Sequence, residues 1–185
     1  NTLNTFSFDF TENDKYFQSN SFQPERDLPY VNIMLKRCRT HHTYLECSQT
    51  TLFDSLFTAV DAKDLPGMTD VDASLLYFCS LVAKHNKVAL TGECADEIFG
   101  GYPWFYRSEL MNRDGFPWSA DLSARTVFLS DDVKASLDLY GYSHARYEET
   151  LARVPKLAGE SEEEARRRAI GYLNIKWFMQ TLLDR

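Results

Sequence analysis

Three carboxylates fall within five positions near the middle of the chain, at Glu93, Asp96 and Glu97. They directly follow residues 88–92, a short apolar run that ends in a threonine and a glycine, and this pattern predicts a buried strand, a turn and an acidic helix start. Like charges this close repel one another unless a positive group lies among them, so the cluster predicts a site for a cation or a cationic ligand. A helix that begins near Cys94 would place Glu93 and Asp96 on one face. The alternative is that Asp96 and Glu97 only complement the positive end of a helix dipole.

The elements that would carry this cluster alternate between strands and helices. Strands are expected at 5–10, 43–47 and 88–90, and helices are expected to open at Asp27 with Pro29, at Thr50 and at Asp72. Strands separated by helices predict an α/β fold with a parallel sheet and right-handed crossover helices. Ligands of such sheets bind beyond the carboxyl ends of the strands, which is where residues 91–97 would lie.

The second part of the chain has the pattern of helices only. The expected helix starts are Ser130, Ser143 and a position near Glu162. We expect a single partial domain over residues 1–185, in which residues 1–102 form the alternating part and residues 103–185 cover the sheet and wall the site.

The twelve residues from Thr91 to Tyr102, Thr-Gly-Glu-Cys-Ala-Asp-Glu-Ile-Phe-Gly-Gly-Tyr, resemble a motif of the synthetase domain of glutamine-dependent asparagine synthetases. That motif is Ser-Gly-Glu-Gly-Ala/Ser-Asp-Glu-Leu/Val-Phe-Gly-Gly-Tyr, and this chain departs from it at Thr91, Cys94 and Ile98. The resemblance covers most of the chain more weakly, through residues 5–10, the pair His41-His42 and residues 177–185, with poor matches at 11–40 and 61–74. It implies an incomplete fold like that of the adenine nucleotide α-hydrolases and an ATP-dependent carbon–nitrogen ligase.

In the family that the motif resembles, the reaction has two steps. Aspartate attacks the α-phosphorus of ATP to give an acyl-adenylate and pyrophosphate, and ammonia from glutamine then displaces AMP to give asparagine. The resemblance implies that Asp96 ligands Mg²⁺, which lets two anions meet. It implies that Glu93 is the carboxylate needed for adenylate formation and for ammonia attack, with a general-base role for the proton that leaves nitrogen.

Other positions are implied to bind the nucleotide. Thr91 and Gly92 would border it, the glycine because ligand atoms can approach its backbone closely, and Phe8 matches a position whose backbone meets the adenine ring. Glu97 is left as either a supporting residue or a helix cap. Tyr102 is expected to belong to the core or to the wall of the site.

The resemblance also implies parts that this chain does not contain. These are a glycine- and serine-rich pyrophosphate loop ahead of residue 1, a glutaminase domain in the longer protein, and a lysine-bearing segment downstream. We therefore expect the 185 residues alone to be inactive, because phosphates would lack the donors of the loop. Whether ammonia arrives free or through a channel, and whether the protein is a homodimer, is left open.

Two other functions are compatible with the pattern. One is a relative that activates another carboxylate, such as a β-lactam synthetase or a peptide-cyclising enzyme, although those often depart from glutamate at the position of Glu93. The other is a non-catalytic domain that keeps the fold for assembly, against which Glu93 and Asp96 both count.

Composition excludes several classes of partner. A net charge of −7 argues against nucleic acid and anionic membrane surfaces, and no apolar stretch approaches the roughly 20 residues that span a bilayer. Four cysteines without Cys-x-x-Cys spacing indicate neither a zinc site nor a set of disulfides, and they favour the reduced cytoplasm as the location.

Two other groups of side chains are interpreted as structural. His41 and His42 would point to opposite faces of a strand and cannot bind one metal ion together. The glutamates at 162–164 and arginines at 166–168, four apart, predict three ion pairs on a solvated helix.

Overall fold

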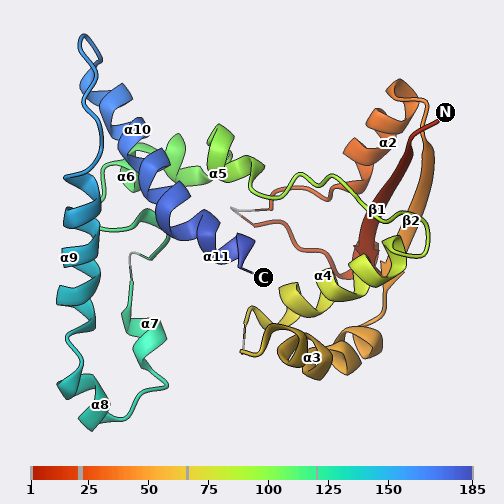
Figure 1. Cartoon of the computed structure of the whole chain (residues 1–185), viewed down its shortest axis with the longest axis horizontal. Helices are drawn as coiled ribbons and strands as arrows, with labels where there is room; N and C mark the ends of the chain where they lie inside the picture. Colours follow the sequence, from red (N-terminus) through yellow and green to blue (C-terminus); the bar gives the residue numbers. More distant parts are fainter. Residues whose placement is uncertain (1, 21–22, 66, 120, 185) are drawn as a thin grey trace. The chain divides into compact units, whose positions relative to one another are not determined.

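The structure is a computed structural model that describes residues 2–20, 23–65, 67–119 and 121–184. Its contacts divide the chain into two compact units, an N-terminal unit that extends to Thr91 and a C-terminal unit, Gly92–Asp184. Each unit is described by itself below, with the elements labelled as in Figure 1.

The N-terminal unit is built on two parallel strands. Its elements are β1 (Asn4–Phe10), α1 (Asn13–Tyr16), α2 (Leu28–Arg37), β2 (His41–Cys47), α3 (Gln49–Lys63) and α4 (Thr69–Val82). The two strands pair in parallel from Asn4 with His41 to Phe10 with Cys47. The order of strand, helix and parallel strand confirms the predicted α/β class.

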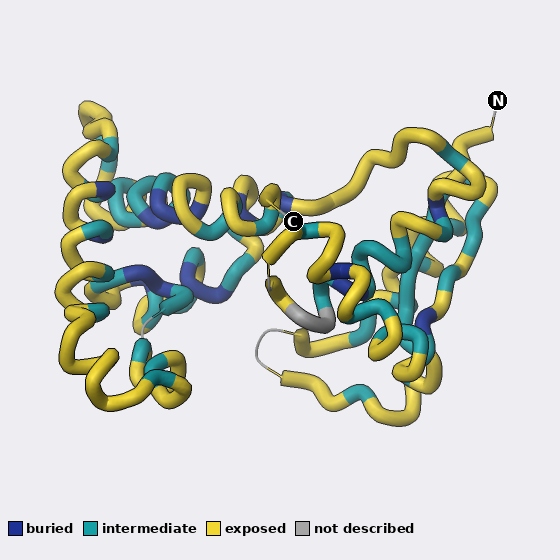
Figure 2. Tube along the Cα trace, turned by 60° about the horizontal axis from the view of Figure 1, so that its bottom comes forward, coloured by how far each residue is buried: buried dark blue, intermediate teal, exposed yellow. Residues whose placement is uncertain are grey.

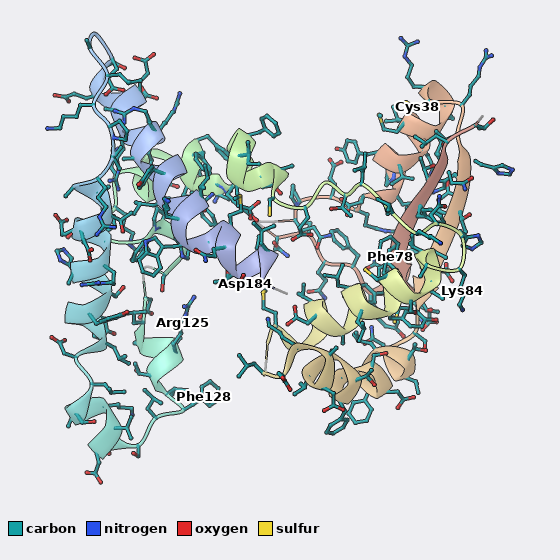
Figure 3. The ribbon with its side chains drawn as sticks, in the orientation of Figure 1. Cys38, Phe78, Lys84, Arg125, Phe128 and Asp184 are labelled. Atoms are coloured by element: carbon teal, nitrogen blue, oxygen red, sulfur yellow. The ribbon has the colours of Figure 1, made fainter. Side chains whose placement is uncertain are left out.

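The alternation in residues 5–10 directs the side chains of β1 to opposite faces of this strand pair. Phe78 of α4, labelled in Figure 3, extends toward β1, and its ring lies edge-on to Phe8 with centroids 5.4 Å apart. On the other face, His42 contacts the hydroxyl oxygens of Thr5 and Ser7 at 2.9 and 3.0 Å. Successive residues of a strand point to opposite faces, so the prediction that the histidine pair does not share an ion is consistent with this arrangement.

Two helix starts differ from the predictions. Ser48, not Thr50, caps α3, and its Oγ accepts the N–H of Thr51 at 3.1 Å. Helix α4 begins at Thr69, before the expected start at Asp72. The Asp72 carboxylate instead reaches back and accepts the N–H of Met68 at 2.8 Å. Helix α3 therefore begins earlier because its capping oxygen is that of Ser48, whereas α4 begins at Thr69 without a side-chain cap at Met68.

The predicted strand at 88–90 is wrong. These residues form no strand within the described chain, and Val88 and Leu90 are 79% and 98% exposed. The sheet of the described residues contains β1 and β2 alone. A strand requires a neighbouring strand for its backbone hydrogen bonds, and an apolar run does not by itself specify that neighbour.

The described part of the C-terminal unit contains helices and no strand, as predicted. They are α5 (Ala95–Phe99), η1 (Pro103–Phe105), α6 (Ser108–Met111), η2 (Pro117–Ser119), α7 (Ser123–Thr126), α8 (Asp131–Ser136), α9 (Leu139–Leu151), α10 (Glu162–Leu173), the π-helix η3 (Asn174–Phe178) and α11 (Met179–Leu183). Ser130 caps α8 as expected. The cap of α9 is Asp138 and not Ser143, which lies inside that helix.

Two groups of buried side chains hold the C-terminal unit together. The first is centred on Trp104, Met111 and Ile170, and the second on Phe116, Tyr147 and Leu173. The buried positions recur along η1, α9 and α10 in Figure 2. Helix α10 supplies one residue to each group, so it is the element on which this unit packs.

The predicted ion pairs of α10 form at one position of three, between Glu163 and Arg167. Arg166 instead donates to the carbonyl oxygen of Met111 at 2.6 Å and to the hydroxyl of Tyr147 at 2.9 Å. The expectation of a solvated arginine face is therefore wrong at this position. The guanidinium satisfies oxygens of other elements, which local spacing cannot reveal.

Candidate functional site

The motif of the C-terminal unit forms a short helix between two left-handed residues. Cys94 has φ 67° and precedes α5, and Gly100 has φ 75° and follows it. The N–H groups of Gly100 and Gly101 both donate to the carbonyl oxygen of Asp96 at 3.0 Å. The helix therefore begins where the sequence predicted, and the glycine pair turns the chain at its end. Cys94 is buried, as a small residue there would be.

The three carboxylates of the motif differ in exposure although they are close in sequence. Glu93 and Asp96 are exposed, whereas Glu97 is 2% exposed. The hydroxyl of Tyr102 donates to Oε1 of Glu97 at 2.7 Å. A buried carboxylate requires hydrogen bonds, and Tyr102 supplies one, so the expectation that Tyr102 only contributes to a core or wall is incomplete.

The negative charge of the motif acts on the pKa of Tyr102. Burial raises this pKa most, followed by the hydrogen bond to Glu97 and then by the charges of Glu97, Asp96 and Glu93. Loss of the phenolic proton would place a second anion beside these carboxylates in a partly desolvated position. The charges of the three acids singled out from the sequence therefore all raise the pKa of Tyr102.

Gly101 makes room for the carboxylate of Asp96. A Cβ atom at residue 101 would lie 1.9 Å from Oδ1 of Asp96 and 2.8 Å from its Cγ. Any larger residue would displace this carboxylate. The closeness of Gly101 to Asp96, five positions earlier, depends on the path of the chain after α5.

Among the described residues, two of the three acids of the motif form no ion pair that would neutralise their charge. Within the described residues, neither Asp96 nor Glu97 has a lysine or arginine nitrogen within 4.0 Å. By contrast, Glu149 on α9 pairs with both Arg146 and Arg153. Exposed Asp96 presents oxygen ligands of the kind that hard cations prefer. Because Asp96 and Glu97 also lie in the first turn of α5, a favourable interaction with the helix dipole applies to both.

Gly92 is not required by the packing of its own unit. Among the described residues of the C-terminal unit, no atom lies within 4 Å of the position of a Cβ at residue 92. Its φ is also outside the left-handed region that favours glycine. The space beside this backbone is open, as close approach of a ligand would require.

Phe8 and Thr91 belong to the N-terminal unit. Thr91 is exposed at the end of that unit. Phe8 is among the residues that line a cavity of about 420 Å³, together with Ser7, Asp9, Phe10, Leu45 and Glu46 near the carboxyl ends of β1 and β2. The Phe8 ring packs on Phe78 of α4, so by strand alternation Phe8 offers its main chain to the cavity on the α2 side.

A second cluster lies on the surface of the C-terminal unit. One ligand atom each from Asp114, His144 and Glu148 lies within 4.8 Å of the others, and all three residues are exposed. His144 Nε2 is 3.3 Å from Asp114 Oδ2. The contact between His144 and Asp114 is an exposed surface ion pair, and such a pair is enough to explain why these side chains lie close together.

Comparison with known proteins decides the family. The family described as "Asparagine synthase" matches residues 1–185. The chain belongs to the asparagine synthase family. It is similar to the "Asparagine synthetase [glutamine-hydrolyzing] 3" of Bacillus subtilis (strain 168), with 50% identity over 183 residues that cover 99% of this chain and 30% of the relative. The chain thus spans about 30% of the length of this relative.

Family membership confirms the family that the motif predicted. No helix among the described residues is both long enough and apolar enough to cross a membrane. The four cysteines are all free of disulfides in the described structure. Two features of this asparagine synthase motif were not found from the sequence, namely the hydrogen bond from Tyr102 to Glu97 and the space that Gly101 leaves for Asp96. The only signal for them was their position at the end of the twelve-residue motif.

Proposed function

We propose that this chain is the synthetase portion of an asparagine synthetase that joins ammonia to the side-chain carboxyl of aspartate. ATP would activate the carboxylate as aspartyl-adenylate with release of pyrophosphate, and ammonia from glutamine would then displace AMP to give asparagine. The observation that carries this proposal is the acidic motif itself, in which Glu93 and Asp96 are exposed and the buried Glu97 accepts the hydroxyl of Tyr102. The reaction brings together two anions, ATP and the aspartate carboxylate, and a cation such as Mg²⁺ reduces their repulsion. An acidic site can bind that cation.

Asp96 fits the role of a Mg²⁺ ligand. Its carboxylate is exposed, has no lysine or arginine partner within 4.0 Å among the described residues, and rests in the space left by Gly101. Mg²⁺ prefers such oxygen ligands, and when bound it would neutralise charge between the triphosphate and the substrate carboxylate. Glu97 would support the site from the interior of the unit, because its buried carboxylate accepts a hydrogen bond from the Tyr102 hydroxyl.

Glu93 is assigned to adenylate formation, the step that releases pyrophosphate, and to proton transfer in the ammonia attack that follows. Its carboxylate is exposed at the start of the motif, immediately before the strained Cys94 that opens α5. When ammonia nitrogen attacks the acyl carbon of the adenylate, the carbon–oxygen bond to AMP breaks and the nitrogen must lose a proton. A carboxylate close to this nitrogen can accept that proton as a general base.

Thr91, Gly92 and Phe8 are assigned to nucleotide binding. Gly92 supports this because its own unit leaves open the space where a side chain would lie. Phe8 supports it because it borders the cavity near the carboxyl ends of two parallel strands, which is where such sheets bind ligands. ATP is thus the proposed nucleotide substrate, with Mg²⁺ as its cation.

Further parts of the proposal concern the longer protein. The relative is named glutamine-hydrolyzing, so we propose a glutaminase domain as the source of ammonia and the cytoplasm as the location.

The experiment that tests the function measures pyrophosphate release from ATP and Mg²⁺, with and without aspartate, using the full-length protein that carries this chain. Glu93→Gln is expected to lower the aspartate-dependent rate by roughly 10²-fold or more. The matched control is Glu109→Gln, which removes an exposed carboxylate of the same unit in α6 and should leave the rate unchanged. Release without aspartate dependence would indicate another carboxylate substrate, and the absence of release in the unmodified protein would favour a non-catalytic role.

A further inference from the structure

The long helix that packs the C-terminal unit changes its winding where it reaches the motif. Helix α10 ends at Leu173, and the chain continues as the π-helix η3 (Asn174–Phe178) before α11 begins. π-Helical turns inside α-helices are rare, and they occur frequently at functional sites. The residues that this winding positions are therefore candidates for a functional role.

Asn174, the first residue of the π-helix, has no exposed surface. Neither its Oδ1 nor its Nδ2 has a hydrogen-bond partner among the described residues. Two other buried polar side chains of the described unit are partnered, Glu97 by Tyr102 and Thr150 by the Arg146 carbonyl and Trp177. The buried Nε1 of Trp104 and Nε of Arg146 also lack a partner in the described part of the chain, but in Asn174 both polar atoms of the side chain do. An unpaired buried amide lowers stability, and an apolar residue of similar shape would avoid that penalty.

The π-helix lies directly against the motif. Its residues contact α5, the helix that carries Asp96 and Glu97. The ring of Phe178 lies edge-on to the ring of Tyr102, with centroids 5.4 Å apart. Residues four apart lie on nearly the same side of a helix, so Asn174 shares the side of Phe178 that faces the ring of Tyr102.

We propose that Asn174 is a positioning residue for the carboxylates of α5, an inference that rests on the proposed synthetase function. Its amide is kept unpaired so that an N–H can donate to the buried Glu97 carboxylate when substrates bind. Hydrogen bonds of a catalytic site often tighten only in the substrate complex. Glu97, which accepts one bond from Tyr102, has lone pairs left for a second.

The test compares Asn174→Leu and Asn174→Asp in the full-length protein. Leucine removes the unpaired amide and keeps the approximate volume, whereas aspartate keeps the shape and removes both N–H donors. Asn174→Leu is expected to unfold at the same or a higher temperature than the unmodified protein. Both variants are expected to lower kcat for aspartate-dependent pyrophosphate release by about tenfold or more, with KM for ATP changed less than about twofold.

The control is Ile170→Val, which shortens a fully buried side chain of α10. It should lower the unfolding temperature and leave kcat unchanged, which is the opposite pattern. A lower unfolding temperature for Asn174→Leu with an unchanged kcat would overturn the proposal, because the amide would then be structural. Full kcat in Asn174→Asp would overturn the donor role. Absence of aspartate-dependent release in the unmodified protein would refute the proposed function instead, and the unfolding temperature of Asn174→Leu would still decide whether the amide supports the fold.

Discussion

Gly101→Ala would test whether the position of the Asp96 carboxylate governs the reaction. The new Cβ would lie 1.9 Å from Oδ1 of Asp96. An ordinary contact begins near 3.4 Å, so the oxygen must move by about 1.5 Å. Because this oxygen is the end of a flexible, exposed side chain, rotation of the carboxylate relieves the overlap and the unit should remain folded.

The expected loss of activity follows from that displacement. A misplacement of about 1 Å in a reacting constellation costs about 10²-fold in rate, or about 2.7 kcal/mol. Pyrophosphate release should therefore fall by at least this factor in Gly101→Ala, and higher Mg²⁺ concentrations should recover part of the rate. Circular dichroism and the unfolding midpoint would check that the variant is folded.

The matched control for this variant is Gly171→Ala in the same unit. A Cβ at residue 171 would meet the Phe105 ring at 3.9 Å, an ordinary contact, and Gly171 lies within α10, where alanine is favoured by about 0.5–1 kcal/mol. This control should keep full activity. An active Gly101→Ala with an unchanged response to Mg²⁺ would refute the reasoning, because displacement of Asp96 would then have no consequence.

Two further predictions concern the nucleotide and pH. Gly92→Ala should leave the unfolding midpoint unchanged or slightly higher, because no atom of its unit lies within 4 Å of the new Cβ. KM for ATP should nevertheless rise roughly tenfold, because the new methyl group would occupy space that ATP approaches. An unchanged KM would contradict a close approach of ATP to this backbone. Hydrogen bonds from Arg168 and from the Leu157 N–H lower the pKa of Glu160. The folded state therefore gains stability from ionised Glu160 above its ordinary pKa and loses it as the pH falls through the lowered pKa. Unfolding midpoints measured from about pH 6 to about pH 3 should fall less steeply in Glu160→Gln than in Glu162→Gln, and parallel curves would show that this contact is not formed.

Local patterns were sufficient for the elements whose geometry is set within a few residues. The alternation of residues 5–10 placed β1, and Asp27 with Pro29 placed the start of α2. The glycine pair and the acids of the motif placed α5 to within a residue. Strand alternation and helix capping are short-range properties of the backbone, so these features could be predicted without the rest of the fold.

The failed predictions share a dependence on distant partners. The run at 88–90 is apolar, as a buried strand would be, but the described structure gives it no strand to pair with. Arg166 has glutamate four positions earlier, but it bonds instead to oxygens of Met111 and Tyr147. Spacing shows which local contacts are available, while the competing contact from another element decides which one forms.

The sequence by itself determined the α/β order of the N-terminal part, the helical character of the second part and the family to which the motif belongs. It also identified the cluster of Glu93, Asp96 and Glu97. Only the tertiary structure decided that Glu97 is buried while Asp96 is exposed, that Gly101 leaves the space for Asp96, and that Asn174 lies unpaired in the interior. The physical reason is that burial and the choice of hydrogen-bond partner depend on residues that the folded chain brings together from far along the sequence.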